Sequence, residues 1–159
     1  MTAGSNSVQQ YHSTPETMSD PYHLNRFIEA QELDYRSALA EIEAGRKVSH
    51  WMWYVFPQYD GLGFSSTSRH FAIKSREEAE AYLGDPVLGP RLGECVDALL
   101  AVIGRTAHEI FGSPDDIKLK SCMTLFAHIS AEGSVFEQVL DKYFDGHRDL
   151  KTLELVRGC

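Results

Sequence analysis

The stretch SREEAEAYLGDPVLGPRLGECVDALL, Ser75 to Leu100, decides the fold class. Ser75 and Glu78 have the spacing of a capping box, in which a serine oxygen accepts a backbone N–H and the glutamate bonds back to the cap. Gly84 is a natural helix end, and Asp85–Pro86 places a cap and a first-turn proline at the start of the next helix. Apolar side chains recur at helical spacing through the rest of the stretch. The stretch therefore predicts two consecutive helices.

Similar helix-start signals follow along the chain. They are TAHE at Thr106–Glu109, SPDD at Ser113–Asp116 and SVFE at Ser134–Glu137, and a last helix is expected from about Asp149 to Val156. Upstream, apolar residues recur at helical spacing from Leu24 to Ile42, and Gly45 provides the end. We therefore predict an all-α fold, a compact multihelical single domain of six or seven helices with an irregular aromatic segment at residues 45–74.

The irregular segment begins GRKVSHWMWYVFPQYDGLG, Gly45 to Gly63, and contains both tryptophans of the chain. Large aromatic side chains usually form the core. Here, however, cations and a histidine precede them and hydroxyl residues follow, which is typical of a ligand pocket. If the segment is helical, Trp51 and Trp53 point in nearly opposite directions and only one faces the core. If it is extended, both share a face.

Length and charge limit the classes of function. The chain has 159 residues and a formal net charge of −8, so we expect one domain and no binding to nucleic acid, whose phosphates need a basic partner. No apolar run is long enough for a membrane span and no secretory signal is visible, so we expect a cytoplasmic protein. Residues 1–22 are rich in polar residues and predict a disordered N-terminal tail before a helical domain at residues 23–157.

The cysteines and the common catalytic motifs indicate little chemistry. Cys95, Cys122 and Cys159 are far apart, so we expect no disulfide framework and no metal site. The usual nucleotide-binding and hydrolase motifs are absent, and we expect no cofactor. Cys122 has no histidine at a suitable spacing, which favours a buried thiol. Gln31 lies on the apolar face of the first long helix, so its amide is either paired within the core or directed into a cavity.

A basic island lies within this acidic chain. Between Gly45 and Arg76 there are five Lys or Arg side chains and one anion, Asp60. Such an island can attract a small anionic ligand, although its side chains could equally be solvated or paired with neighbouring glutamates. An aromatic wall beside cations and hydroxyls suits a ligand that is part ring and part anion. The candidate ligand-binding residues are Arg46, Lys47, His50, Trp51, Trp53, Gln58, Ser65 and Ser68.

His50 is also the candidate acid–base catalyst, because imidazole titrates near neutral pH. Its alternative role is structural, as a histidine packed against tryptophan. The sequence leaves open whether the chain is an enzyme.

Five stretches carry a family resemblance. They are RFIEAQ, GRKVSHWMWYVFPQYDGLGFSSTSRHFAI, EAEAYLGDPVLGPRLGECVDALL, IFGSPDDIKLKSCMTLF and FDGHRDLKTLELV. Together they resemble the domain of unknown function 1810 family, some of whose members carry a calpastatin label. The resemblance covers about Leu24 to Val156 and implies an all-helical fold. Relatives often have a proline where this chain has Leu33, so a break of the first helix near Gln31 is an alternative to a continuous one.

A more distant similarity concerns the order of three features: the aromatic segment ending in Phe-Pro, the serine-rich stretch, and EAYLGDPVLGPRL. In this order they resemble NADAR-type hydrolases, which implies a ligand related to ADP-ribose. Two hypotheses follow. The first is a protein that binds or hydrolyses a nucleotide-like or ADP-ribose-like anionic ligand. The alternative is a helical protein-interaction module with no catalytic activity, in which the aromatic segment is core.

Overall fold

The computed structural model describes residues 19–158, which form nine helices. They are α3 (Asn25–Glu43), α4 (Met52–Val55), α5 (Ser66–His70), α6 (Arg76–Gly84), α7 (Leu88–Ala101), α8 (Ala107–Phe111), α9 (Asp115–His128), α10 (Val135–Phe144) and α11 (Leu150–Arg157). The described residues contain no sheet, only an isolated parallel bridge between Tyr59 and Ile73. The all-α prediction is confirmed, and the short helices α4 and α5 lie within the segment expected to be irregular.

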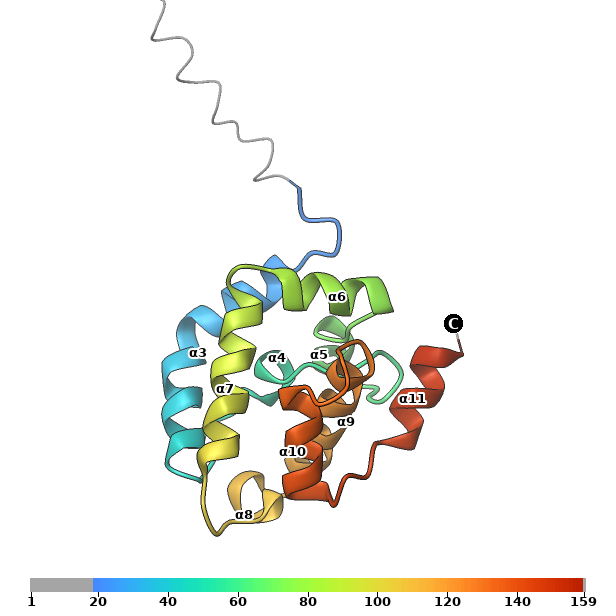
Figure 1. Cartoon of the computed structure of the whole chain (residues 1–159). Coiled ribbons are helices and arrows are strands. Elements are labelled where there is room, and N and C mark those ends of the chain that lie inside the picture. The colour runs from blue at the N-terminus through green and yellow to red at the C-terminus, as the bar shows by residue number, and fades with distance from the viewer. Residues whose placement is uncertain (1–18, 159) are drawn as a thin grey trace, which may run out of the picture.

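Helix α9 is the centre of the fold. It packs against α8, α10 and α11, while α3 and α7 lie side by side and α6 packs against α7 (Figure 1). Leu119 and the whole run Ser121–Ala127 of α9 are buried. Because almost every side of α9 is covered by another element, this helix lacks the polar face that a surface helix shows.

The local capping signals locate most helix starts. Ser75 and Ser134 each accept a hydrogen bond from the backbone N–H three residues later, and Thr106 forms a complete capping box with Glu109. The expectation that Ser113 caps α9 is wrong. The residue before α9 is Pro114, and no side chain in the described part of the chain caps this helix. The backbone N–H of Asp116 donates to Gly112 O instead, at 2.9 Å.

Helix α3 is continuous, so the alternative of a break near Gln31 is not observed. The Gln31 amide donates to Tyr54 O at 2.7 Å and to the Tyr82 hydroxyl at 3.2 Å, and its oxygen accepts from Arg91 at 3.4 Å. Of the two alternatives for Gln31, pairing within the core is therefore confirmed. No helix within residues 19–158 has the length and apolar character of a membrane span.

Two side chains of α3 hold the ends of the segment at residues 45–74. At its beginning, Glu41 accepts hydrogen bonds from the backbone N–H groups of residues 48 and 49 and from Trp51 Nε1, at 2.8–2.9 Å. At its end, Arg26 donates to the carbonyl oxygens of His70 (2.7 Å) and Ala72 (2.8 Å). The segment is therefore fixed to α3 although most of it is not helical.

The expected N-terminal tail falls largely on residues 1–18, which lie outside the described residues, as does Cys159. The described chain first contacts the helical domain through Asp20. Its carboxylate accepts hydrogen bonds from the backbone N–H groups of Leu24 (2.7 Å) and Asn25 (3.0 Å) at the start of α3.

Candidate functional site

The two tryptophans have different environments. Trp51, which precedes α4, is fully buried against Phe56 and Phe111 and donates its Nε1 proton to Glu41. Trp53, inside the single turn of α4, is only partly buried. The structure thus has the helical alternative, in which one tryptophan belongs to the core and the other is available to a site.

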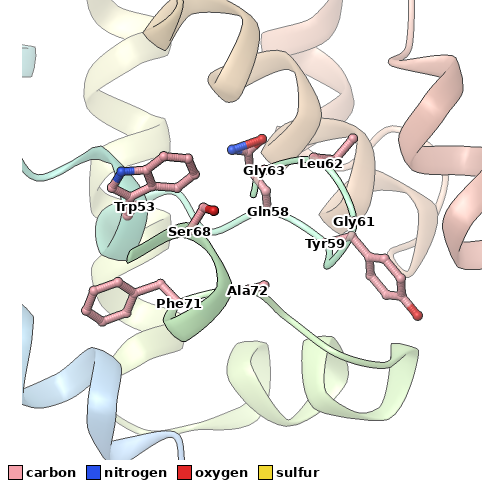
Figure 2. A pocket seen from close by; sticks show the side chains of 9 residues that line it. All are labelled: Trp53, Gln58, Tyr59, Gly61, Leu62, Gly63, Ser68, Phe71 and Ala72. Atoms are coloured by element: carbon pink, nitrogen blue, oxygen red, sulfur yellow. The ribbon is translucent and has the colours of Figure 1, made fainter. Parts of the chain in front are cut away.

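Three cavities share Trp53 as a lining residue. The one we call the Trp53 groove has a volume of about 310 Å³ and is lined by Trp53, Gln58, Leu62, Pro114, Ile117, Lys118, Ser121 and Asp149. The His50 cavity, about 110 Å³, is lined by Lys47, His50, Met52, Trp53, Asp115 and Lys118. A third hollow of about 10 Å³, large enough for one water molecule, lies beneath the loop at residues 59–63 (Figure 2).

Gln58 is the unusual residue of this region. It is 9% exposed and lines both the Trp53 groove and the small hollow, yet its side-chain amide has no hydrogen-bond partner within residues 19–158. Its backbone is fixed, because the carbonyl of Gln58 accepts from Ile73 N at 2.9 Å. Figure 2 shows the Gln58 amide, the Trp53 ring and the Ser68 hydroxyl around the same space. Buried polar groups are nearly always paired, so this amide needs an explanation.

A charged cluster borders the Trp53 ring. Asp115 pairs with Lys47 at 2.8 Å through one oxygen and with Lys118 at 3.1 Å through the other. The Nζ atom of Lys118 lies 4.1 Å from the centroid of the Trp53 ring. Burial alone would raise the pKa of Asp115, but hydrogen bonds from the two lysines and their positive charges lower this pKa below its ordinary value. Asp115 is therefore ionised at neutral pH and pairs with two ammonium groups, of which Lys118 lies beside the Trp53 ring and Lys47 lies 5.1 Å from the centroid of the Trp51 ring.

The two lysines differ in how available they are. The side chain of Lys47 is only 7% exposed, and its Nζ also donates to Ser49 O at 2.6 Å. The side chain of Lys118 is 20% exposed and lines both the Trp53 groove and the His50 cavity. Lys118 is therefore the cation that a ligand could reach with less rearrangement.

Asp149, which precedes α11, also lines the Trp53 groove. One carboxylate oxygen, Oδ2, accepts hydrogen bonds from Ser121 Oγ (3.1 Å), from Thr152 N (3.1 Å) and from the Thr152 hydroxyl. Its backbone N–H donates to Thr124 Oγ1 at 2.9 Å. Ser121 and Thr124 are polar residues within the buried part of helix α9, and they position the start of α11.

The remaining residues expected at a site are dispersed. Arg46 is exposed and lines none of these three cavities. Ser65 caps α5 by accepting from Ser68 N, and the Ser68 hydroxyl donates back to Ser65 O at 2.9 Å. Ser68 lines the small hollow. The structure thus brings together Lys47, His50, Trp53, Gln58 and Ser68 around the three cavities, and it leaves Arg46, Trp51 and Ser65 outside them.

The other basic residues of the island also separate. Lys74 Nζ donates to the carbonyl oxygens of Arg69 (2.8 Å) and Ala72 (3.2 Å), and Arg76 pairs with Glu80 at 3.0 Å. The most accessible cation of the site, Lys118, comes instead from α9, outside the island. The sequence signal for Lys118 is a charged residue in a helix that is otherwise largely buried. Spacing along α9 alone does not place Lys118 beside Trp53.

His50 is exposed at the rim of its cavity rather than packed against tryptophan. Within residues 19–158 its only hydrogen bond is at its backbone oxygen, from the Tyr54 hydroxyl at 3.2 Å. Cys122 is fully buried and free, as expected, and burial raises the pKa of its thiol well above the ordinary value. Among residues 19–158 there is no group of three or more His, Cys, Asp or Glu side chains that could hold a metal ion.

These features define an all-helical single-domain protein with a groove around one tryptophan. The chain belongs to the family described as "Protein of unknown function (DUF1810)", whose sequence profile matches residues 21–156. Among solved structures it is similar to the conserved hypothetical protein Rv1873 from Mycobacterium tuberculosis, with 49% sequence identity and a TM-score of 0.85 over 87% of this chain and 99% of that chain. No curated protein matches the chain. The family expected from the sequence is confirmed, and the more distant similarity to NADAR-type hydrolases stays a prediction.

Proposed function

We propose that the Trp53 groove binds a small ligand with a planar ring and an anionic group, of nucleotide or ADP-ribose type. The observation that carries the proposal is the Gln58 amide, which is nine-tenths buried and unpaired within residues 19–158. Leaving a buried polar group unpaired costs about 1–3 kcal/mol. Departures of this kind are expected where function requires them, and a ligand that pairs with the amide would remove the cost.

The rest of the groove suits the same ligand. A volume of about 310 Å³ is at the lower end of the range for small-molecule pockets, which combine apolar walls with a few polar groups. The ligand ring would pack against Trp53, and the Gln58 amide would bond to its polar edge. Lys118 would meet the anionic group, because its ammonium already lies beside the ring.

Titration of tryptophan fluorescence with AMP and ADP-ribose tests the proposal, with adenine and inorganic phosphate as partial ligands. We expect both nucleotides to bind and to raise the melting temperature, since both would bind the native state only. Trp53→Leu and Lys118→Ala should each weaken binding about 10- to 100-fold, the effect of losing a stacking wall or a charge-assisted contact.

Arg46→Ala is the matched control for Lys118→Ala. Arg46 is also a cation near the aromatic segment, but it is exposed and lies outside the groove, so its loss should change affinity less than about twofold. The proposal fails if neither nucleotide binds at millimolar concentration. The assignment of the anion contact fails if Arg46→Ala weakens binding as much as Lys118→Ala does.

His50 is the proposed proton carrier for any reaction in this region, since it lines the cavity next to the groove. His50→Ala should leave nucleotide affinity unchanged, and where a nucleotide is turned over it should abolish turnover. Turnover that survives in His50→Ala would remove His50 from this role.

The second candidate, a helical protein-interaction module, has its own observation. Phe64, Ile117 and Leu150 are exposed large apolar residues, and Ile117 itself lines the Trp53 groove. Exposed large apolar side chains are one sign of a contact surface. This candidate would be preferred if no nucleotide binds and if Leu150→Glu abolishes binding of a protein partner without changing the melting temperature.

A further inference from the structure

We infer that Asp149 binds hydroxyl groups of the ligand, so that the ligand of the Trp53 groove is a ribose rather than a deoxyribose derivative. The inference rests on the proposed function and adds a chemical class to it. It concerns a residue whose sequence signal was only that of a helix start.

The geometry of Asp149 fixes its carboxylate. Three donors converge on Oδ2: Ser121 Oγ, Thr152 N and the Thr152 hydroxyl. The other oxygen, Oδ1, has no hydrogen-bond partner in the part of the chain that the structure describes. Because one oxygen is fixed by three donors, the carboxylate does not need to reorganise when a ligand approaches the other.

The free oxygen restricts what the ligand can present. An ionised carboxylate accepts hydrogen bonds and donates none. No lysine, arginine or histidine of residues 19–158 forms an ion pair with Asp149, so no direct counter-charge occupies its free oxygen. A ligand must therefore bring N–H or O–H donors to this wall, and neighbouring hydroxyls on a sugar provide two at once.

Lys118, which lines the same groove, has the opposite requirement and favours an anionic group. The Gln58 amide, which lines the same groove, can both donate and accept. A ribose phosphate linked to a base has hydroxyls, an anion and a planar ring with a mixed polar edge. A 2′-deoxy sugar lacks one of the two donors that Asp149 would receive.

The test compares AMP with 2′-deoxy-AMP in the full-length protein and in Asp149→Ser. Serine is as good a helix cap as aspartate, so this variant keeps an acceptor for Thr152 N at the start of α11 but removes the carboxylate oxygen that faces no partner. We expect the unsubstituted protein to bind AMP about 10- to 100-fold more tightly than 2′-deoxy-AMP. Asp149→Ser should bind both nucleotides equally, and more weakly than the unsubstituted protein binds 2′-deoxy-AMP, because 2′-deoxy-AMP keeps one hydroxyl contact to Asp149 that this variant lacks.

Asp149→Asn provides a second variant of the same shape, and it should also lose most of the preference. Equal binding of the two nucleotides by the unsubstituted protein would overturn this inference and leave the proposed function intact. If the protein binds tryptamine more tightly than AMP, and Asp149→Ser loses tryptamine binding, the inference is overturned in favour of an ammonium ligand. Failure of every nucleotide to bind would overturn both the inference and the proposed function.

Discussion

Gln58 and Gln31 are both buried amides, but only one of them is paired within residues 19–158. Gln31 bonds to Tyr54, Tyr82 and Arg91, whereas Gln58 has no partner within residues 19–158. Replacing a paired amide leaves its partners unsatisfied, while replacing an unpaired one removes a desolvated polar group. The same substitution should therefore have opposite effects at the two positions.

Methionine is the suitable replacement because its volume is close to that of glutamine and its shape is adaptable. We predict that Gln58→Met raises the free energy of unfolding by about 1 kcal/mol and that Gln31→Met lowers it by about 1–3 kcal/mol. Urea denaturation with an unchanged m-value measures both. Gain of stability with loss of nucleotide affinity would mark Gln58 as a functional residue. If Gln58→Met destabilises the protein as Gln31→Met does, an ordered water satisfies the amide and its role is structural.

Part of this site could be predicted residue by residue. His50, Trp53 and Gln58 stand in one short stretch in which polar residues flank an aromatic run, so the sequence predicts that they lie close together. Lys118 and Asp149 come from α9 and from the start of α11, and only tertiary packing brings them to Trp53. The cations of the island do not gather at one cavity, because charged residues that are close in sequence here have different partners.

At the scale of elements, Glu41 links α3 to the segment that carries His50 and Trp51. Burial alone would raise the pKa of Glu41, but hydrogen bonds from Ser49, Val48 and Trp51 outweigh it and lower this pKa from 4.5 to about 2. A carboxylate whose pKa is lower in the folded state stabilises the fold above its unfolded-state pKa and loses that contribution as pH falls. The stabilisation should be complete above about pH 4.5 and should decrease toward pH 2.

We predict that Glu41→Gln is less stable than the unsubstituted protein by about 1–2 kcal/mol at pH 6. Each unit of pKa shift corresponds to about 1.4 kcal/mol of stability, and solvent screening reduces this contribution for a partly exposed carboxylate. The difference should shrink steadily between pH 5 and pH 3 in denaturant titrations. Glu43→Gln, at an exposed position two residues further along α3, is the control and should show little difference at any pH. A difference for Glu41→Gln that is constant from pH 6 to pH 3 would contradict the role of its ionised form.

The helices differ in how far sequence could predict them. The starts of α6, α8, α10 and α11 were visible because a cap and the N–H group it binds are only three residues apart. The helices α4 and α5 were not, since four or five residues carry too little periodicity to identify a turn. The prediction that Ser113 caps α9 is wrong because the N–H group three residues later, that of Asp116, already donates to Gly112 O.

For the whole molecule, the chain between α3 and α6 depends on Arg26. This residue is 8% exposed, and its guanidinium donates to the carbonyl oxygens of residues 22, 23, 70 and 72 and to Glu78 Oε2 at 2.6 Å. Glu78, only 2% exposed, also accepts from Lys74 N at 2.9 Å. One planar side chain thus joins the start of α3, the end of the aromatic segment and the first turn of α6. The segment that forms one wall of the Trp53 groove is therefore held from both ends by α3.

We predict that Arg26→Ala lowers the free energy of unfolding by about 3–5 kcal/mol, because it leaves the buried Glu78 carboxylate without its counter-charge. Arg26→Lys should also destabilise the protein, since an ammonium group lacks the planar fork that reaches several acceptors at once. Arg76→Ala is the matched control: Arg76 forms an exposed pair with Glu80 one turn along α6, and its loss should cost less than about 0.5 kcal/mol.

In a double-substitution cycle measured by urea denaturation, Arg26→Ala and Glu78→Gln should be far from additive, since the second change removes the charge that the first leaves unpaired. Costs for Arg26→Ala below about 1 kcal/mol, or additive costs in the cycle, would show that the pair does not hold the segment. The predicted size of the effect also distinguishes this buried pair from the half-exposed pair of Arg76, although both join an arginine to a glutamate at 2.6 and 3.0 Å. The difference follows from burial. An uncompensated charge on buried Glu78 lowers the free energy of unfolding strongly, whereas one on half-exposed Glu80 is solvated and changes it little.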